Sequence, residues 1–241
     1  MKIVSIIIPA YNEGAFIAQL LEHIIKVPTE TIGFKKEIIV VDDGSTDDTA
    51  NIAAGFAGVT VIQQQNSGKG RAVQRGVKDC TGDYVLVQDA DLEYSPADYL
   101  VMLPALTPDN NTAVYGSRPR GVIERHGWKN PFPGRDPDQQ LGPWIMNVVL
   151  AIQTFILYGR WITDMLTGYK IYPAATIKSF NIKTHGFETD HELSAKLVKA
   201  GVDIVEIPIS YTPRSLEEGK KIRAIDGLIA IWTLIKYRFV D

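Results

Sequence analysis

Short runs of branched apolar residues alternate with segments of helical apolar spacing through the first half of the chain. The continuous apolar run at residues 3–8 predicts a strand buried on both faces, and further strands are predicted at 37–41, 59–63, 84–88 and 112–115. Apolar residues at helical spacing predict helices at 16–25, 47–56, 71–78 and 96–106. This alternation predicts an α/β fold with a doubly wound, mainly parallel sheet. Because ligands of such sheets bind beyond the carboxyl ends of the strands, we expect the functional side chains there.

The second half of the chain departs from this alternation. Residues 118–142 contain several prolines and no apolar period, so we expect a mobile, functional loop. Regular patterns return at 143–158, 188–200, 203–207 and 222–239, and predict an apolar helix, an amphipathic helix, a strand and a C-terminal helix. We expect one main domain over residues 1–212, followed by a basic and apolar amphipathic helical tail over 213–241.

Composition excludes several classes of protein. The 241 residues suit one large α/β domain, and the net charge of −3 provides no basic field for nucleic acid, so we expect no nucleic-acid partner. The single cysteine, Cys80, excludes an internal disulfide and a cysteine-based metal site, and fits a reducing compartment. The apolar start of the chain is too short for a signal peptide and is typical of a strand, so we expect a cytoplasmic location.

Three carboxylates follow the strand predicted at 84–88, namely Asp89, Asp91 and Glu93. Alternate residues of an extended chain share a face, so we expect these side chains to converge. A hard divalent cation, bound by carboxylates, water and substrate phosphate, would relieve their repulsion. The alternative is a solvated acidic turn in which Asp91 or Ser95 caps a helix that begins at Pro96.

Polar clusters also follow the first two strands. Pro9 to Glu13 follows the first strand, and Asp42 and Asp43 follow the second, before a Gly-Ser-Thr turn. An aspartate in this place is suited to accept hydrogen bonds from a nucleotide base or ribose. The alternative is a simple turn followed by a helix cap.

The glycine-rich segment 66–72, Asn-Ser-Gly-Lys-Gly-Arg-Ala, precedes the third predicted helix. It matches neither the P-loop spacing nor the dinucleotide fingerprint, which argues against an ATPase and a Rossmann dehydrogenase. Its glycines permit close approach of the backbone to a phosphate. Lys69 or Arg71 then faces either a diphosphate or solvent.

Together these motifs resemble family 2 glycosyltransferases. The resemblance rests on Ile-Ile-Ile-Pro-Ala-Tyr-Asn-Glu, Val-Val-Asp-Asp-Gly-Ser-Thr-Asp, Asn-Ser-Gly-Lys-Gly and Gln-Asp-Ala-Asp-Leu-Glu. Five segments of the second half are similar to the dolichyl-phosphate mannose synthase branch, which includes polyprenyl-phosphate glucosyl- and mannosyltransferases. These segments are residues 116–118, 164–170, 186–192, 213–214 and 218–222. Leu166-Thr167 and Lys170 depart from the pattern common in mannose synthases, which weakens a mannose-specific interpretation. The resemblance implies the GT-A nucleotide-diphospho-sugar fold with C-terminal interfacial helices.

The resemblance also implies roles for individual residues. The donor-binding residues would be Pro9, Ala10, Tyr11, Glu13, Asp42, Asp43, Lys69, Asp89 and Ala90. Asp91 and Glu93 would hold Mg²⁺ or Mn²⁺. The catalytic residues would be Asp91, Arg118, Asp190, Arg214, Lys220 and Lys221. The acceptor would meet the loop 118–142 and the residues Ser117, Thr167, Gly168 and Lys170.

The implied reaction is an inverting transfer of a hexose from a donor of the GDP-mannose or UDP-glucose type to polyprenyl or dolichyl phosphate. A phosphate acceptor is already an anion, so it needs the cations named above rather than a base. The alternative acceptor is a sugar hydroxyl of a glycan or glycolipid, which needs a base, with Asp190 or Glu192 as the candidate. A catalytically silent nucleotide-sugar-binding protein is a third hypothesis, which the intact acidic motif disfavours.

Two apolar segments predict contact with a membrane surface. Residues 143–160 are more apolar than a surface helix but too polar to span a membrane, so we interpret them as an interfacial helix. The tail places Trp232 in an apolar stretch flanked by basic residues. We expect a peripheral enzyme at the cytoplasmic face of a membrane; a buried core helix, a homo-oligomer contact or a membrane-protein partner are the alternatives. The four histidines, among them His191, show no ligand spacing, and we interpret them as surface or satisfied side chains.

Overall fold

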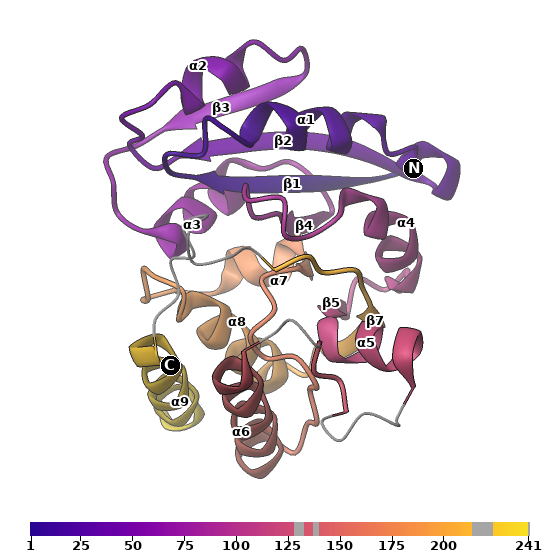
Figure 1. The fold of residues 1–241 in the computed structure, drawn as a ribbon, viewed down its shortest axis with the longest axis vertical. Coiled ribbons are helices and arrows are strands. Elements are labelled where there is room, and N and C mark those ends of the chain that lie inside the picture. Colours follow the sequence, from indigo (N-terminus) through magenta and orange to yellow (C-terminus); the bar gives the residue numbers. More distant parts are fainter. Residues whose placement is uncertain (128–132, 137–139, 214–223, 241) are drawn as a thin grey trace.

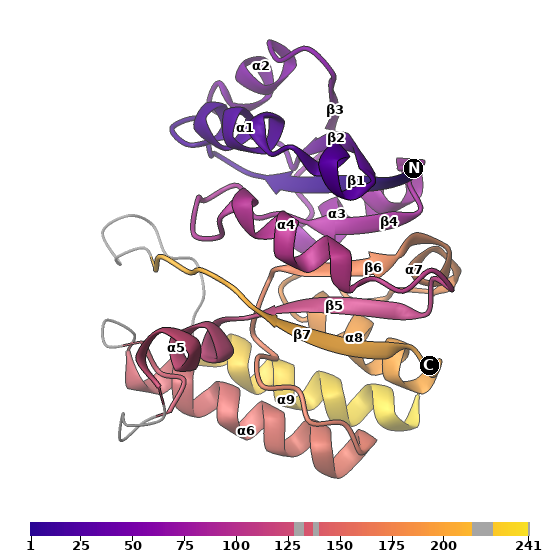
Figure 2. The ribbon, with the colours of Figure 1, turned by 90° about the vertical axis from the view of Figure 1, so that its right-hand side faces the viewer.

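A seven-stranded sheet forms the centre of the molecule in the computed structural model, which describes residues 1–127, 133–136, 140–213 and 224–240. The strand order is β3-β2-β1-β4-β6-β5-β7 (Figures 1 and 2). The strands are β1 (Lys2–Ala10), β2 (Phe34–Asp42), β3 (Val59–Gln63), β4 (Tyr84–Val87), β5 (Thr112–Ser117), β6 (Lys170–Pro173) and β7 (Asp203–Pro208). β6 runs antiparallel to both of its neighbours, and the other strand pairs are parallel. The expected mainly parallel α/β sheet is confirmed.

Helices cover both faces of the sheet, as a doubly wound fold requires. One face carries α1 (Ile17–Lys26), α2 (Thr49–Ala54) and α4 (Tyr99–Met102); the other carries α3 (Lys69–Asp79), α7 (Ala174–Ser179) and α8 (Thr189–Lys199). Beyond α8 lie α6 (Leu141–Tyr158) and α9 (Ala224–Phe239), side by side at the end of the molecule opposite β3 (Figures 1 and 2). Short 3₁₀ turns complete the chain at Thr29–Ile32, Pro96–Asp98 and Leu103–Ala105.

The register of the strands places the predicted motifs at one edge of the sheet. β1 is buried on both sides, because Ile6 and Ile8 enter the core below α1 while Ile7 enters the core below α3. Ala10 pairs with Asp42, so β1 and β2 end level. β6 is antiparallel, and Lys170 at its start lies beside Val87 at the end of β4. The carboxyl ends of β1, β2, β4 and β5 and the start of β6 therefore meet at one edge, which we call the site edge.

Four elements differ from the sequence predictions. Residues 118–126 form a helix, α5 (Arg118–His126), so the prediction of a loop over 118–142 is wrong for this part. The Ser117 hydroxyl accepts a hydrogen bond from the Arg120 backbone N–H, Pro119 occupies the first turn, and Gly127 ends the helix at a φ of 70°. β6 and α7 were not predicted, and the helix predicted at 96–106 is divided into three short turns.

Candidate active site

The loops that follow β1 and β2 form one wall of the site edge. The Asp43 backbone N–H donates to the Ala10 carbonyl at 2.8 Å. Asn12, at a φ of 54°, accepts a hydrogen bond from the Thr46 backbone N–H at 2.8 Å. These bonds bring the predicted donor-binding residues of the two strand ends together, with Ala10, Glu13, Asp42 and Asp43 buried and Tyr11 exposed.

Asp43 connects the second strand end to the glycine-rich segment. Its carboxylate accepts hydrogen bonds from the Gln64 side-chain amide at 2.7 Å and from the backbone N–H groups of Ser67 and Gly68 at 2.9 and 2.8 Å. Asp42 accepts one bond from the Ser45 backbone N–H at 3.4 Å. Asp43 therefore positions the start of α3, and contact of either aspartate with a nucleoside stays a prediction.

The glycine-rich segment packs closely against the chain that precedes α8. Gly68 has a φ of 95°, and a Cβ built on Gly68 or Gly70 would lie 2.8 or 2.7 Å from the His185 carbonyl oxygen. This packing directs Lys69, the first residue of α3, toward the acidic strand end. Its ammonium lies 2.7 Å from Asp89 Oδ1 and 5.7 Å from the centre of the Phe187 ring. Lys69 thus faces the site and forms an ion pair there.

The acidic motif after β4 is a turn, not an extended strand end. Leu92 has a φ of 60°, and the Glu93 backbone N–H donates to Asp91 Oδ1 at 3.2 Å. Asp89 pairs with Lys69, whereas Glu93 Oε2 accepts a hydrogen bond from the Tyr211 hydroxyl at 2.9 Å. The prediction that the three carboxylates share one face is wrong, because the chain turns after Val87. Of the two predicted caps, Ser95 caps the following 3₁₀ turn.

A protein-only metal cage is absent from the part of the chain that the structure describes, where no three His, Cys, Asp or Glu side chains are placed to hold an ion. Asp91 and Glu93 still present hard carboxylate oxygens from one turn. Mg²⁺ commonly binds proteins through one or two carboxylates, with water and substrate phosphates completing its coordination. These residues therefore fit a metal that is bound together with a diphosphate.

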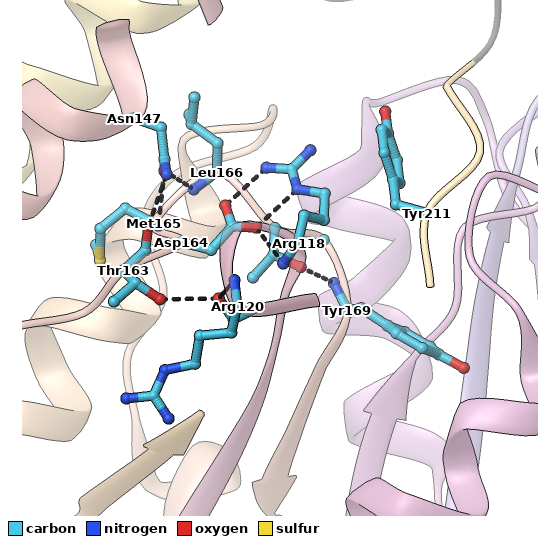
Figure 3. Close-up of polar contacts among 12 residues, drawn as sticks. Arg118, Arg120, Asn147, Thr163, Asp164, Met165, Leu166, Tyr169 and Tyr211 are labelled. Atoms are coloured by element: carbon cyan, nitrogen blue, oxygen red, sulfur yellow. Dashed lines mark hydrogen bonds and ion pairs between the residues drawn. The ribbon is translucent and has the colours of Figure 1, made fainter. Parts of the chain in front are cut away.

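Arg118 is held by a buried carboxylate. Its Nε and Nη2 donate to the two oxygens of Asp164, both at 2.7 Å, and its backbone N–H donates to Oδ2 at 3.0 Å. Asp164 is wholly buried, and the Arg118 guanidinium carbon lies 5.0 Å from the centre of the Tyr211 ring. Figure 3 shows the Arg118 side chain between Asp164 and this ring. The structure thus directs one planar cation toward the site edge.

The predicted acceptor-binding residues line the interior of the site edge. The Ser117 and Thr163 hydroxyls are 2.8 Å apart, and the Thr167 hydroxyl accepts a hydrogen bond from the Tyr169 backbone N–H at 3.2 Å. The Gly168 N–H donates to the Tyr94 hydroxyl at 3.1 Å. Ser117 and Thr167 are wholly buried, so their contact with an acceptor stays a prediction.

Lys170 is also wholly buried, on the side of the sheet that faces α8. Its ammonium lies 4.8 Å from the centre of the Tyr115 ring and has no hydrogen-bond partner among the residues described. Burial lowers the pKa of Lys170, while the nearby carboxylates of Asp190 and Asp164 oppose that change. Lys170 is therefore a buried amine beneath the site edge, and its predicted contact with an acceptor remains untested.

The start of α8 separates the two candidate bases. Asp190 is partly exposed in the first turn, within electrostatic range of Lys69. Glu192 is wholly buried and accepts hydrogen bonds from the Thr184 hydroxyl and from backbone N–H groups, besides an ion pair with Lys196 at 2.9 Å. Glu192 is occupied by structural contacts, so its prediction as a base is wrong and Asp190 remains.

His191 is buried between these two residues, which contradicts its interpretation as a surface or satisfied histidine. It is 5% exposed, and its Nδ1 has no hydrogen-bond partner within the described ranges. Burial, with a contribution from Lys170, lowers the pKa of His191 to about 3. The imidazole is therefore neutral throughout the physiological range.

Some residues at the site edge were not assigned a role from the sequence, and some predicted ones lie outside the structure. Tyr94, Asp164 and Tyr211 were not assigned a role because their partners are distant in sequence. Asp164 begins the segment 164–170 that resembles the family, but that segment does not indicate its pairing with Arg118. Arg214, Lys220 and Lys221 lie outside the described residues.

Several proteins of known name are similar to the chain. Glycosyltransferase AglJ of Haloferax volcanii is 30% identical, over 88% of this chain and 63% of AglJ, so the chain spans less than two thirds of that relative. Dolichyl-phosphate beta-glucosyltransferase of Saccharomyces cerevisiae is 28% identical over 93% of this chain and 70% of its own length. UDP-N-acetylglucosamine–dolichyl-phosphate N-acetylglucosaminyltransferase of Methanococcus voltae is 26% identical over 92% of this chain and 91% of its own.

Solved structures establish the fold, and a family model establishes the family. Glucosyl-3-phosphoglycerate synthase from Mycobacterium tuberculosis, crystallised with Mn²⁺, UDP and phosphoglyceric acid, has a TM-score of 0.69 at 21% identity, over 100% of this chain and 80% of that chain. This likeness confirms the GT-A fold. The model of glycosyl transferase family 2 matches residues 5–161. The chain is therefore a glycosyltransferase that belongs to family 2, and its relatives fit the polyprenyl-phosphate branch that its motifs resemble.

Proposed function

We propose that this enzyme transfers a hexose, with inversion, from a nucleotide-diphospho-sugar of the GDP-mannose or UDP-glucose type to a polyprenyl or dolichyl phosphate. Two relatives are named for transfer to dolichyl phosphate, which supports a lipid phosphate as acceptor. The alternative acceptor is a sugar hydroxyl of a glycan or glycolipid, for which Asp190 would act as the base.

The donor would lie along the ends of β1 and β2, with its diphosphate near Lys69 and the acidic turn. Asp91 and Glu93 would hold Mg²⁺ or Mn²⁺, which would supply Lewis-acid neutralisation of the departing diphosphate. The ion pair with Asp89, at 2.7 Å, holds the Lys69 ammonium beside the acidic turn. Its positive charge would there stabilise the negative charge of the donor diphosphate. The M. tuberculosis structures that contain UDP with Mn²⁺ or Mg²⁺ support a divalent metal for this fold.

The acceptor phosphate would bind at Arg118 and approach the anomeric carbon from the face opposite the departing diphosphate. One of its oxygens forms a bond to that carbon while the bond to the donor β-phosphate oxygen breaks, which inverts the configuration. Because the phosphate is already ionised, the chain supplies orientation and positive charge rather than a base. Arg118 is suited to this role because Asp164 fixes its guanidinium by two bonds of 2.7 Å.

The observation that supports the proposal of a lipid acceptor is an exposed apolar face on the two outer helices, α6 and α9. We call it the α6–α9 face, and its members are Ile145, Val149, Ile152, Phe155 and Ile156 of α6 and Leu228, Ile229 and Trp232 of α9. Ile156 is 74% and Trp232 64% exposed. Exposed apolar side chains gathered on two helices that pack together mark a site of interaction, and Lys236 and Arg238 in the last turn of α9 suit anionic headgroups.

The packing of α6 favours a helix that lies on a membrane rather than one that crosses it. The helix has 18 residues and is long and apolar enough to span a membrane, and 22% of these residues are buried. Gln153 Nε2 donates to the Ile231 carbonyl at 2.9 Å, and the Tyr158 hydroxyl donates to the Leu234 carbonyl at 2.7 Å. These bonds attach one side of α6 to α9, so the exposed side of α6 remains available for contact with lipid. We propose a peripheral enzyme at the cytoplasmic face of a membrane.

Transfer assays distinguish the two acceptors. Purified enzyme with Mg²⁺ or Mn²⁺ receives a panel of UDP- and GDP-sugars, and either a short-chain polyprenyl phosphate or the corresponding free polyprenol and sugar acceptors. We expect a β-linked lipid phosphate product from an α-linked donor, identified by NMR, and none after EDTA or Asp91→Asn. Transfer only to a hydroxyl acceptor would replace the proposal with its alternative, and retention of configuration would overturn the inverting mechanism.

Vesicle flotation tests the membrane surface separately. We expect the enzyme to float with vesicles of phosphatidylglycerol and phosphatidylcholine, and the Ile156→Ser/Trp232→Ser variant to stay in the soluble fraction. Val101→Ser is the matched control, because Val101 is 52% exposed on α4, outside the α6–α9 face. Equal flotation of all three proteins would remove the assignment of this face.

A further inference from the structure

The segment between β7 and residue 213 crosses the acidic turn. Tyr211 pairs with Tyr94 in an isolated antiparallel bridge. The Thr212 backbone N–H donates to the Glu93 carbonyl at 3.0 Å, and the Ser210 backbone N–H donates to Asp98 Oδ2, also at 3.0 Å. The bond from Thr212 is part of this bridge, so residues 210–212 are attached at two places, the end of the acidic turn and Asp98. Both places are more than 100 positions away in sequence, as the 118 between Tyr211 and Glu93 illustrate.

The Tyr211 side chain contacts both halves of the site. Its hydroxyl donates to Glu93 Oε2 at 2.9 Å. Its ring centre lies 5.0 Å from the Arg118 guanidinium (Figure 3). The same ring centre lies 5.3 Å from the centre of the Tyr94 ring. One side chain thus contacts a carboxylate that we assign to the metal and the arginine that we assign to the acceptor phosphate.

We propose that Tyr211 is a positioning residue that orients Glu93 through its hydroxyl and Arg118 through its ring. The proposal rests on the proposed function, and extends it by a residue that neither the motifs nor the family comparison singles out. The two parts of the side chain have separable effects, because within the described residues the hydroxyl bonds to Glu93 and the ring contacts Arg118.

The backbone of the turn explains why Glu93 needs this support. Leu92 occupies the left-handed region at a φ of 60°, which a branched, non-glycine residue adopts only when its surroundings hold it there. The bonds from Tyr211 and Thr212 fix the residue that follows, through its side chain and its carbonyl. Arg118 has two kinds of contact. Asp164 accepts hydrogen bonds from the edge of the guanidinium, and the face of the Tyr211 ring lies against the cation.

The hydroxyl is tested by binding of the metal itself. Wild type and Tyr211→Phe are titrated with Mn²⁺ in saturating UDP and separately in saturating GDP, and bound Mn²⁺ is measured by electron paramagnetic resonance. Loss of one hydrogen bond to a charged group predicts about tenfold weaker Mn²⁺ binding. The KM for the acceptor should stay unchanged in Tyr211→Phe, because the ring remains on Arg118. Tyr211→Leu should show the same metal defect and a raised acceptor KM.

Tyr84→Phe is the matched control, because the Tyr84 hydroxyl donates to the Thr107 carbonyl at 3.0 Å at the opposite edge of the sheet. Wild-type Mn²⁺ affinity in Tyr211→Phe, or an equal loss in Tyr84→Phe, would overturn the inference. Asp91→Asn separates this failure from that of the proposed function. If Asp91→Asn abolishes Mn²⁺ binding while Tyr211→Phe is silent, only the role of Tyr211 is wrong; if both variants bind normally, the metal assignment fails as well.

Discussion

Removal of one charge from the buried pair of Arg118 and Asp164 should both destabilise the fold and weaken acceptor binding. Asp164→Asn keeps the shape of the side chain but leaves the arginine without its counter-ion. The Asp164 side chain is wholly buried and that of Arg118 is 17% exposed, so water cannot replace the lost charge easily. Breaking a buried ion pair by removing one partner costs about 3–5 kcal/mol. The asparagine oxygen retains one acceptor, so we expect a loss of about 3 kcal/mol.

The same substitution at an exposed pair provides the control. Asp203 lies 2.9 Å from Arg160, and these side chains are 63% and 50% exposed. Exposed pairs contribute about 0–1 kcal/mol, so Asp203→Asn should change stability little. Urea unfolding followed by circular dichroism gives both free energies. For a chain of this size, about 3 kcal/mol corresponds to a Tm lower by about 6–12 °C.

The kinetic part of the prediction concerns the KM for the acceptor. Asp164→Asn should raise the KM for polyprenyl phosphate and leave the KM for the nucleotide sugar near its wild-type value. Asp164 orients Arg118, whereas the donor would lie along the loops after β1 and β2, which we call the donor wall. Equal stability losses in Asp164→Asn and Asp203→Asn would refute the assignment of a buried, unreplaced charge. An unchanged acceptor KM in a folded Asp164→Asn enzyme would refute the role of Arg118 in binding the phosphate.

Three further predictions address the donor wall, the histidine and the glycine-rich segment. Asp43→Asn should lower the unfolding free energy measured in urea by about 1–3 kcal/mol, because the Ser67 and Gly68 N–H groups lose a charged acceptor. Asp42→Asn should mainly weaken nucleotide binding measured by calorimetry. The reverse pattern would contradict this division of roles. Folded His191, with a pKa of about 3, stays neutral while the unfolded residue protonates near pH 6.5, so its contribution is present above pH 6.5 and is lost as the pH falls toward 3. Between pH 7 and pH 5 the wild type should therefore lose about 2 kcal/mol more than His191→Gln in urea titrations, and parallel curves would exclude a depressed pKa. Gly70→Ala, whose Cβ would lie 2.0 Å from Thr189 Oγ1, should cost about 1–3 kcal/mol in thermal melts, whereas Gly142→Ala meets open space and should be neutral or slightly stabilising; equal melting temperatures would argue against close packing at Gly70.

Local pattern was sufficient for most of the sheet and for the position of the donor wall. Residues 3–8 predict a strand because an unbroken run of branched apolar residues suits a strand covered on both faces, and β1 (Lys2–Ala10) includes this run. Polar residues directly after β1, β2 and β4 had to meet at one edge, because parallel strands end on the same side. The glycines of 66–72 required a close backbone approach, which the structure provides at His185.

Short elements were hidden because tertiary contacts, rather than local pattern, hold them. β6 (Lys170–Pro173) has four residues, one of them a lysine, and is a strand because it lies between β4 and β5. α5 (Arg118–His126) was masked by the prolines around it, although Ser117 and Pro119 are favourable residues for a helix start.

The sequence by itself determined the family and the α/β fold, and it supplied acidic and basic candidates for the site, because motif order and apolar spacing are local properties of the chain. Tertiary structure alone decided which of these residues face one another. Lys69 pairs with Asp89, Asp164 holds Arg118 from 46 positions away, and Tyr211 reaches Glu93 across 118 positions. The acidic motif also turns at Leu92 instead of continuing as a strand. The physical reason is that a side chain's charge and size are local properties, whereas its burial and its hydrogen-bond partners arise only when distant segments pack together.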